Sequence, residues 1–220
     1  MSNNVFTTFW QTVTTRQDDI VENLIEHLYL SFTSVFIAIL ISIPLGIFIS
    51  RKEKFAEFFI GVTAVFQTIP SLAFFGFLVP IFGIGSVTAI IALTLYALLP
   101  ILRNTYTGII GVDQAIIEAG RGMGMTGMQI LRKIELPLAL PFVMAGVRTA
   151  TVLTVGVATL ATFVGAGGLG ELIYRGLTSW NNYLVLAGAL PAALLAIFFD
   201  FILKMLEKSA TPKGLKNKNI

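Results

Sequence analysis

Residues 58–102 form an uninterrupted run of 45 residues without a charged side chain. As a single helix this run would measure about 68 Å, twice the thickness of the hydrocarbon core of a bilayer. We therefore expect it to cross a membrane, turn within the Phe-Gly-Ile-Gly-Ser sequence of residues 82–86, and cross back. This predicts spans near residues 58–80 and 87–105. It also predicts an all-α membrane protein, because a helix satisfies its own backbone hydrogen bonds within lipid.

Composition and the other apolar segments agree with this class. Charged residues make up 12% of the chain and the mean hydropathy is +0.84, whereas soluble domains carry about 25% charged residues. Three further segments are long and apolar enough to span a bilayer, at residues 28–50, 138–164 and 183–201. We expect about five transmembrane helices in one domain (27–206), after an acidic extracellular or interfacial segment (1–26) and before a basic cytoplasmic tail (207–220).

The basic residues predict the orientation of these spans. With the N-terminus outside and the C-terminus cytoplasmic, 13 of the 15 Lys and Arg residues lie inside, and only Arg16 and Arg175 lie outside. Basic residues in short loops favour the cytoplasmic side of a membrane. The pattern therefore predicts a multi-pass protein of the cell membrane with an odd number of spans. The thirteen are Arg51, Lys52, Lys54, Arg103, Arg121, Arg132, Lys133, Arg148, Lys204, Lys208, Lys213, Lys216 and Lys218.

A polar segment within residues 107–137 carries the signals of two short helices. Asp113 can cap the first helix by accepting hydrogen bonds from its free N–H groups. Thr126 and Gln129 have the spacing of a capping box for a second helix. Pro137 is expected to end that helix near Glu135, because proline disfavours the helical conformation in the residue before it. Together these signals predict a helical hairpin outside the bilayer.

Glycine and apolar residues give this hairpin a joint and a face. Gly124 lies between the two expected helices, where glycine permits a turn with positive φ. Ile130, Leu131 and Ile134 share one face of the second helix, whereas the neighbouring basic residues point elsewhere. A loop that only connects two spans needs neither two caps nor an apolar stripe. The pattern therefore favours a docking function.

The segment resembles the EAA loop of ABC-importer permeases. That motif reads Glu-Ala-Ala, three residues, Gly, nine residues, and then Ile, any residue, Leu and Pro. The positions that match are Glu118, Ala119, Gly124, Ile134, Leu136 and Pro137, and Gly120 stands where the second alanine is usual. The resemblance covers about residues 20–210 and includes the sequences TIPSLAFFG (68–76) and VGAGGLG (164–170). It implies the MetI-like fold of type I ABC-importer permeases, with residues 107–137 as a cytoplasmic coupling loop.

Within that family the chain is most similar to the Opu-type permeases of Gram-positive bacteria, which import glycine betaine, carnitine or choline. The short chain length and residues 67–75, 99–124 and 165–177 carry this similarity. The resemblance implies uptake of a quaternary-amine osmolyte in osmoprotection. It implies no cofactor on this chain, with ATP and Mg²⁺ on a partner ATPase. The implied partners are ABC ATPase subunits, a second permease chain (identical or paralogous), an extracellular substrate-binding lipoprotein, the osmolyte and membrane lipid, but no nucleic acid.

The resemblance also assigns roles to the residues of the loop. Glu118, Ala119 and Gly120 would couple to the ATPase, with Gly124 as the joint. A cleft of the ATPase would be filled by Ile130, Leu131 and Ile134. The loop would be connected to the fourth span by Leu136 and Pro137.

Three residues of the apolar segments are candidates for a pore or for helix packing. Gln67 and Pro70 interrupt the second span, where proline frees a backbone carbonyl. Such a break either lines a cavity or is a kink packed against neighbouring helices. Arg148, on the fourth span, either reaches the cytoplasmic interface or pairs with a residue of the pore or of a neighbouring helix. Asp200 is expected to pair with Lys204, four residues further along the last span.

Several other activities are excluded or disfavoured by the sequence. The chain has no cysteine and no G-x-x-x-x-G-K-[ST] loop, which excludes thiol chemistry and P-loop ATP binding. Residues 165–170 spell G-x-G-x-x-G, but no βαβ pattern surrounds them. We expect them to form a tight turn at the outer mouth, followed by a short helix near residues 171–177. His27 is expected at the membrane interface.

The alternative function is an ATP-independent secondary transporter or channel for a small solute. Proton-coupled transporters usually place carboxylates in mid-membrane, and this chain has none there. An intramembrane enzyme would need a nucleophile or a metal-binding set, which the sequence also lacks. We therefore expect a transporter subunit and not an enzyme.

Overall fold

The structure is a computed structural model that describes residues 5–210, and every element in that range is helical. The all-α prediction is therefore confirmed. The longer helices are α2 (Gln17–Ile49), α3 (Glu53–Thr68), α4 (Ser71–Phe82), α5 (Ser86–Ile110), α8 (Leu136–Ala158) and α10 (Asn182–Ala210). The shorter ones are α1 (Val5–Thr15), α6 (Gln114–Gly122), α7 (Gly127–Ile130), the π-helical turn η1 (Leu131–Glu135), the 3-10 helix η2 (Thr159–Val164) and α9 (Gly170–Thr178).

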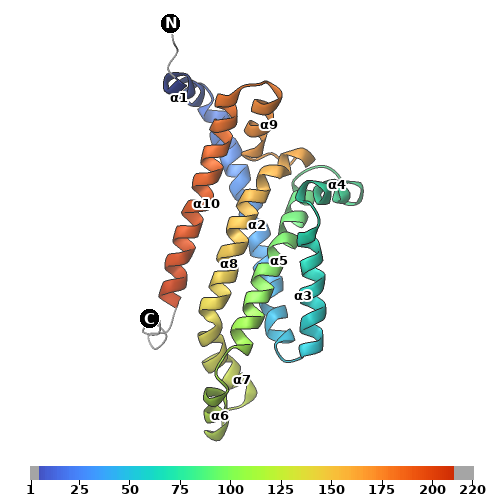
Figure 1. Ribbon diagram of the computed structural model, residues 1–220, viewed down its shortest axis with the longest axis vertical. Coiled ribbons are helices and arrows are strands. Elements are labelled where there is room, and N and C mark those ends of the chain that lie inside the picture. Colours follow the sequence, from blue (N-terminus) through green and yellow to red (C-terminus); the bar gives the residue numbers. More distant parts are fainter. Residues whose placement is uncertain (1–4, 211–220) are drawn as a thin grey trace.

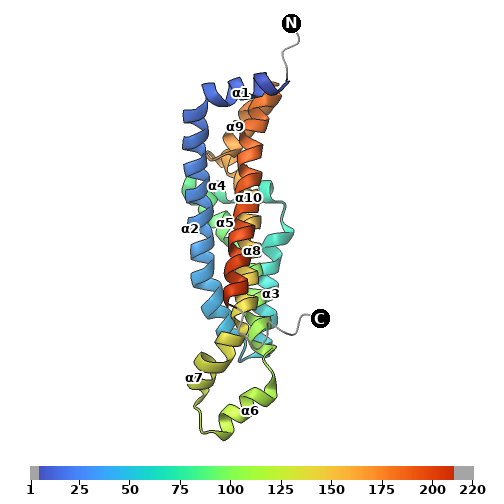
Figure 2. The same cartoon turned by 90° about the vertical axis from the view of Figure 1, so that its left-hand side faces the viewer.

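The long helices form an elongated bundle around α5 and α8 (Figure 1). Helix α5 packs against α2, α3 and α8, and α8 packs in addition against α2 and α10. Helices α1 and α9 lie at one end of the bundle, whereas α6 and α7 project beyond the other end (Figures 1 and 2). The chain therefore enters at the end opposite the α6–α7 hairpin, and α10 runs back toward the hairpin.

Small residues allow α5 and α8 to lie in close contact. A Cβ atom at Gly108 would come within 2.7 Å of the Cβ of Phe142, and one at Gly146 within 2.8 Å of the carbonyl oxygen of Pro100. Ala97 and Ala150 are fully buried in the same contact. Because lipid provides no hydrophobic force between helices, such close packing of small residues stabilises membrane bundles.

The predicted second span is broken in the structure. Helices α3 and α4 meet at Ile69 and Pro70 with a bend of 102°, at the place where the sequence indicates that Gln67 and Pro70 interrupt the span near residues 58–80. Pro70 has no N–H to continue the hydrogen bonds of α3, and it holds Ile69 in an extended conformation (φ −74°, ψ 130°). The predicted turn at residues 82–86 is present, with positive φ at Gly83 and Gly85.

Within residues 5–210, four helical segments are long and apolar enough to cross a membrane, and the bent pair α3–α4 makes five if it counts as one span. The predicted boundary between residues 26 and 27 lies inside α2, which begins at Gln17 and joins the acidic segment to the first span. Most of the predicted basic tail, including Lys213, Lys216 and Lys218, lies outside the described residues.

Candidate functional site

The α6–α7 hairpin has the local geometry that the sequence predicts. The carboxylate of Asp113 accepts a hydrogen bond from the N–H of Ala115 at 2.9 Å and caps α6. Thr126 and Gln129 form both halves of the capping box at the start of α7. Gly124 has φ +78° and provides the turn between them. These features depend on residues at most three positions apart, which is why the sequence predicts them.

The apolar stripe of the hairpin faces inward. Ile130 is 4% exposed and forms a buried cluster with Val112 and Ile117, and Ile134 packs against the same cluster. Ile130 is therefore not available to a cleft of another protein in this conformation. This corrects its expected role, because its apolar surface is used to hold the hairpin together.

The outer surface of the hairpin carries other apolar side chains. Ile116, Met123 and Met128 are 43%, 74% and 57% exposed, and Glu118 and Ala119 are also exposed. Helix α6 therefore presents Ile116, Glu118 and Ala119 outward, while Ile117 and Gly120 face the interior. The prediction from the sequence considers only the apolar stripe of the second helix. A helical wheel of residues 114–122 could have added Ile116 as a candidate.

Gly120 allows α6 to pack closely on the second helix. A Cβ atom at this position would lie 2.8 Å from Cδ1 of Ile134 and 3.4 Å from the sulfur of Met125. Both atoms belong to the ends of flexible side chains. The usual alanine of the motif would therefore fit after a small shift of Ile134, which explains why glycine is compatible with the motif here.

Pro137 does not end the second helix as predicted. Leu136 is helical (φ −61°, ψ −46°), and the chain continues from α7 through η1 into α8. The N–H of Leu136 donates to the carbonyl of Leu131, five residues earlier, so the turn is wider than an α-helical turn. This wider turn provides room for the proline ring, which would otherwise clash with the carbonyl four residues earlier. The hairpin is thus a continuous extension of the fourth span.

An ion pair connects the base of the hairpin to the turn that follows α2. The guanidinium of Arg51 donates to both carboxylate oxygens of Glu135, with 2.9 Å between Nη1 and Oε1. The Glu135 side chain is 3% exposed, whereas that of Arg51 is 48% exposed. A cavity of about 510 Å³ lies beside the pair and is also lined by Arg121 and Met128. The paired residues are 84 positions apart, so no local sequence signal indicates their contact.

Gln67 and Pro70 lie at the break between α3 and α4. The side-chain amide of Gln67 donates to the backbone carbonyl of Tyr96 at 2.9 Å, and the hydroxyl of Tyr96 donates to the carbonyl of Ile69 at 2.5 Å. A cavity of about 330 Å³ opens between the break, α5 and α8, with Leu153 on its far wall. The break therefore lines a cavity, which was one of the two predicted possibilities.

Arg148 connects α8 to α10. Its guanidinium donates to the carboxylate of Glu207 at 3.0 Å and lies 3.4 Å from that of Asp200. Of the two possibilities predicted for Arg148, the structure thus shows pairing with a neighbouring helix. Asp200 pairs with Arg148 and not with Lys204 as predicted, because the guanidinium can reach both carboxylates of α10.

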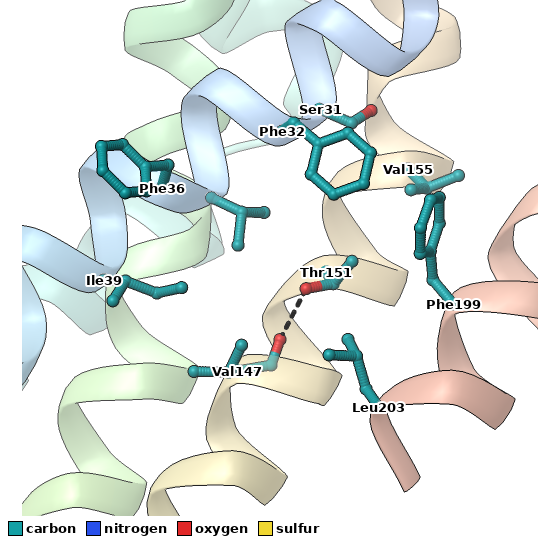
Figure 3. A pocket seen from close by; sticks show the side chains of 10 residues that line it. Ser31, Phe32, Phe36, Ile39, Val147, Thr151, Val155, Phe199 and Leu203 are labelled. Carbon is teal, nitrogen blue, oxygen red and sulfur yellow. Dashed lines mark hydrogen bonds between the residues drawn. The ribbon is translucent and has the colours of Figure 1, made fainter. Parts of the chain in front are cut away.

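A third cavity, of about 180 Å³, has a different character. It lies between α2, α8 and α10 and is lined mainly by apolar side chains, including Phe32, Phe36, Phe199 and Leu203 (Figure 3). The hydroxyl of Thr151 points toward this cavity but donates to the carbonyl of Val147 within α8. The cavity thus suits lipid hydrocarbon and not a polar solute.

The glycine-rich turn closes the end opposite the hairpin. Gly165, Gly167 and Gly168 have positive φ, and the N–H of Gly168 donates to the carboxylate of Glu26 at 2.9 Å. His27 is fully buried against this turn, and its Nε2 lies 3.0 Å from the carbonyl oxygen of Val155. His27, which is expected at the membrane interface, thus packs inside the bundle at this end, because α2 begins before the predicted span.

Comparison with known proteins identifies the family. Residues 38–212 match the family model of the binding-protein-dependent transport system inner membrane component. The chain belongs to this family. It is a permease of the type I ABC importers and a multi-pass membrane protein.

Two curated permeases show the degree of similarity. The chain is 48% identical over 191 residues to the glycine betaine/carnitine/choline transport system permease protein OpuCB of Bacillus subtilis (strain 168), which covers 87% of this chain and 88% of that protein. It is 43% identical over 206 residues to the choline transport system permease protein OpuBB of the same organism, with 94% and 95% covered.

A solved structure supports the same assignment. The permease matches a chain of the MetNI methionine ABC transporter in an inward-facing conformation, with a TM-score of 0.81 and 26% identity. The match covers 90% of this permease and 99% of that chain. The MetI-like fold predicted from the sequence is therefore confirmed.

Proposed function

We propose that this permease forms the translocation pore of an ATP-driven importer for quaternary-amine osmolytes, and that the importer acts in osmoprotection. The observation that carries this proposal is the 43–48% identity, over most of both chains, to permeases named for glycine betaine, carnitine and choline transport. The substrates are those of the relatives: glycine betaine, carnitine or choline. A cytoplasmic ATPase supplies the energy, and an extracellular binding protein delivers the substrate.

The hairpin is the element that couples this permease to the ATPase. Its exposed apolar residues, Ile116, Met123 and Met128, would enter a cleft of the ATPase, beside Glu118 and Ala119. The buried Ile130 and the partly buried Ile134 would keep the hairpin rigid, and Leu131 lines the cavity beside it. Partly exposed Met and Ile side chains are suited to a docking surface, because their burial in a complex removes apolar area from water.

Continuity of the helix provides the path for the movement. Because η1 joins the hairpin to α8 without a loop, displacement of the hairpin would move the fourth span as one body. ATP binding would bring the two ATPases and their hairpins together and open the pore outward, and hydrolysis would reset it. Gly120 and Gly124 permit the compact hairpin, while Leu136 and Pro137 form its junction with α8.

The exposed faces of the bundle differ, and this supports a second permease chain as partner. Helix α8 exposes Thr149, Leu153 and Gly156, which share one face by their spacing, and Leu153 lines the cavity at the α3–α4 break. Helix α10 instead exposes large apolar side chains along its length: Leu186, Leu190, Leu194, Ile197, Phe198, Phe201 and Met205. The face of α10 suits lipid, whereas the small and polar face of α8 would border the pore and the second permease chain.

Reconstitution tests the proposed function. The permease would be purified in mild detergent with its co-purifying subunits and placed in liposomes with binding protein. We expect a stoichiometric ATPase and ATP-dependent uptake of radiolabelled glycine betaine, carnitine or choline. Uptake of betaine by the chain alone and without ATP would instead establish the secondary transporter.

A pair of matched variants tests the role of the hairpin. Met123→Glu places a charge on its exposed tip and should reduce co-purification of the ATPase at least tenfold, without loss of membrane insertion. Trp180→Glu changes a residue that is 92% exposed at the opposite end of the bundle and should retain the ATPase. Equal retention by both variants would exclude this surface as the docking site.

A further inference from the structure

The break between α3 and α4 leaves backbone polar groups without helical partners. Pro70 has no N–H to donate to the carbonyl of Phe66, and the 102° bend directs α4 away from the end of α3. No side chain caps the first turn of α4, so the N–H groups of Ser71 and Leu72 have no intrahelical acceptor. The break therefore presents both free carbonyls and free N–H groups.

The position of the break indicates that it faces a polar environment. Tyr96, which bonds to it, lies near the middle of α5 (Ser86–Ile110), and Thr68 and Pro70 at the break are exposed. Irregular backbone at membrane depth is tolerated only where protein covers it or where it lines an aqueous cavity. A cavity of about 330 Å³ lies at the break. Thr149 and Gly156, which share a face of α8 with Leu153 of its lining, are exposed. The second alternative, an aqueous cavity, therefore fits this site.

The lining of the cavity has a distinct chemistry. It combines one aromatic residue, Tyr96, the polar residues Gln67, Thr68 and Ser71, and an apolar wall that includes Leu153. Among the residues that the structure describes, none with a charged side chain lines this cavity. An aromatic face and carbonyl oxygens attract a quaternary ammonium group, which carries its charge under methyl groups and donates no strong hydrogen bond. An uncharged lining also suits a solute whose net charge is zero.

We propose that the cavity at the α3–α4 break is a transit site of the permease for a zwitterionic quaternary amine. The ammonium group would lie against Tyr96 and the free carbonyls that end α3, and the carboxylate would lie toward Ser71. Discontinuous helices serve zwitterions in this way because their two free ends have opposite partial charges. The inference rests on the proposed function, because it names where within this chain the imported solute is held.

Cysteine labelling tests the site, since the chain contains no native cysteine. Thr68→Cys in the cavity would be compared with Trp180→Cys at the exposed far end, in the full importer reconstituted in lipid nanodiscs. The reagents are two methanethiosulfonates, one with a trimethylammonium group and one with a sulfonate. We expect the ratio of cationic to anionic labelling rates to be about tenfold higher at Thr68→Cys than at Trp180→Cys.

Protection by the solute provides the second readout. Glycine betaine should slow labelling of Thr68→Cys at least threefold, whereas sucrose at the same osmolarity should not. Leu194→Cys, on the lipid-facing side of α10, should react slowly with both reagents and show no protection. Equal rate ratios at Thr68→Cys and Trp180→Cys, or equal effects of betaine and sucrose, would overturn the inference.

Transport kinetics distinguish the contribution of the aromatic ring of Tyr96 from that of its hydroxyl group, which bonds to Ile69. Tyr96→Phe keeps the aromatic face but loses the hydroxyl bond to Ile69 and should retain KM for betaine within about threefold, whereas Tyr96→Leu should raise KM about tenfold. Equal KM values for Tyr96→Leu and the unaltered permease would contradict the site. If the unaltered importer moved no quaternary amine, the proposed function itself would fail, independently of these variants.

Discussion

Gly124 shows that a single backbone torsion controls the shape of the α6–α7 hairpin. It has φ +78°, and a Cβ atom there would meet no atom within 4 Å. Gly122, two residues earlier, is equally unobstructed but does not have positive φ. A Cβ atom at either position meets no steric overlap, so a difference between substitutions at Gly124 and Gly122 would report the conformational strain at Gly124 alone.

We expect Gly124→Val to abolish uptake while membrane insertion survives. A β-branched residue at positive φ costs about 1–2 kcal/mol or forces the turn to rearrange, and rearrangement would misplace α6 relative to α8. Gly124→Asn should retain part of the uptake, because asparagine tolerates this conformation, and Gly122→Ala should retain it fully. Betaine uptake in proteoliposomes measures the effect, and normal transport by Gly124→Val would refute the role of the joint.

The Arg51–Glu135 pair is asymmetric, because the carboxylate is buried and the guanidinium is half exposed. Arg51→Ala leaves a buried carboxylate without a partner, and we expect it to destabilise the hairpin by about 2–4 kcal/mol. Glu135→Gln leaves Arg51 where water can solvate it and should cost about half as much. Thermal unfolding of the purified permease would show this order, and a larger loss for Glu135→Gln would contradict it.

At the scale of elements, local signals predict the helices, whereas long-range contacts determine where helices bend. Asp113 caps α6 and Thr126 pairs with Gln129 because each signal involves residues two or three positions apart. Pro137 gives the same local signal as a helix stop, yet the π turn accommodates it. Pro70 does break its helix, since the bonds of Gln67 and Tyr96 stabilise the bent form. The sequence does not distinguish these two prolines.

The contact between α9 and η2 depends on Gly170. A Cβ atom there would lie 1.8 Å from the carbonyl oxygen of Thr159, which belongs to the backbone and cannot move alone. We expect Gly170→Ala to displace α9 and destabilise the permease by about 2–3 kcal/mol. Gly61→Ala, in α3, meets no atom within 4 Å and should be neutral or slightly stabilising. Thermal unfolding compares the two, and equal midpoints would disprove the close contact.

At the scale of the molecule, the fold class is predictable from the sequence, but the connections that hold it together are not. Hydropathy indicates the spans because the bilayer constrains their length, whereas the odd number of spans that the basic residues favour stays a prediction. The pairs Arg51–Glu135, Arg148–Glu207 and Glu26–Gly168 join residues 59–142 positions apart. Each joins a different pair of segments, and only the folded bundle shows them.

The position of the hairpin also determines a testable orientation. If the positive-inside pattern governs insertion, the hairpin is cytoplasmic, and the end with α1 and α9, which Trp180 follows in the chain, is outside. Single cysteines at Met128 and Trp180 are matched probes, because both residues are exposed at opposite ends and the chain has no other cysteine. In right-side-out vesicles, an impermeant thiol reagent should label Trp180→Cys at once and Met128→Cys only after permeabilisation. The reverse pattern would place the hairpin outside, where no ATPase could reach it, and the coupling proposal would then have to be abandoned together with the orientation.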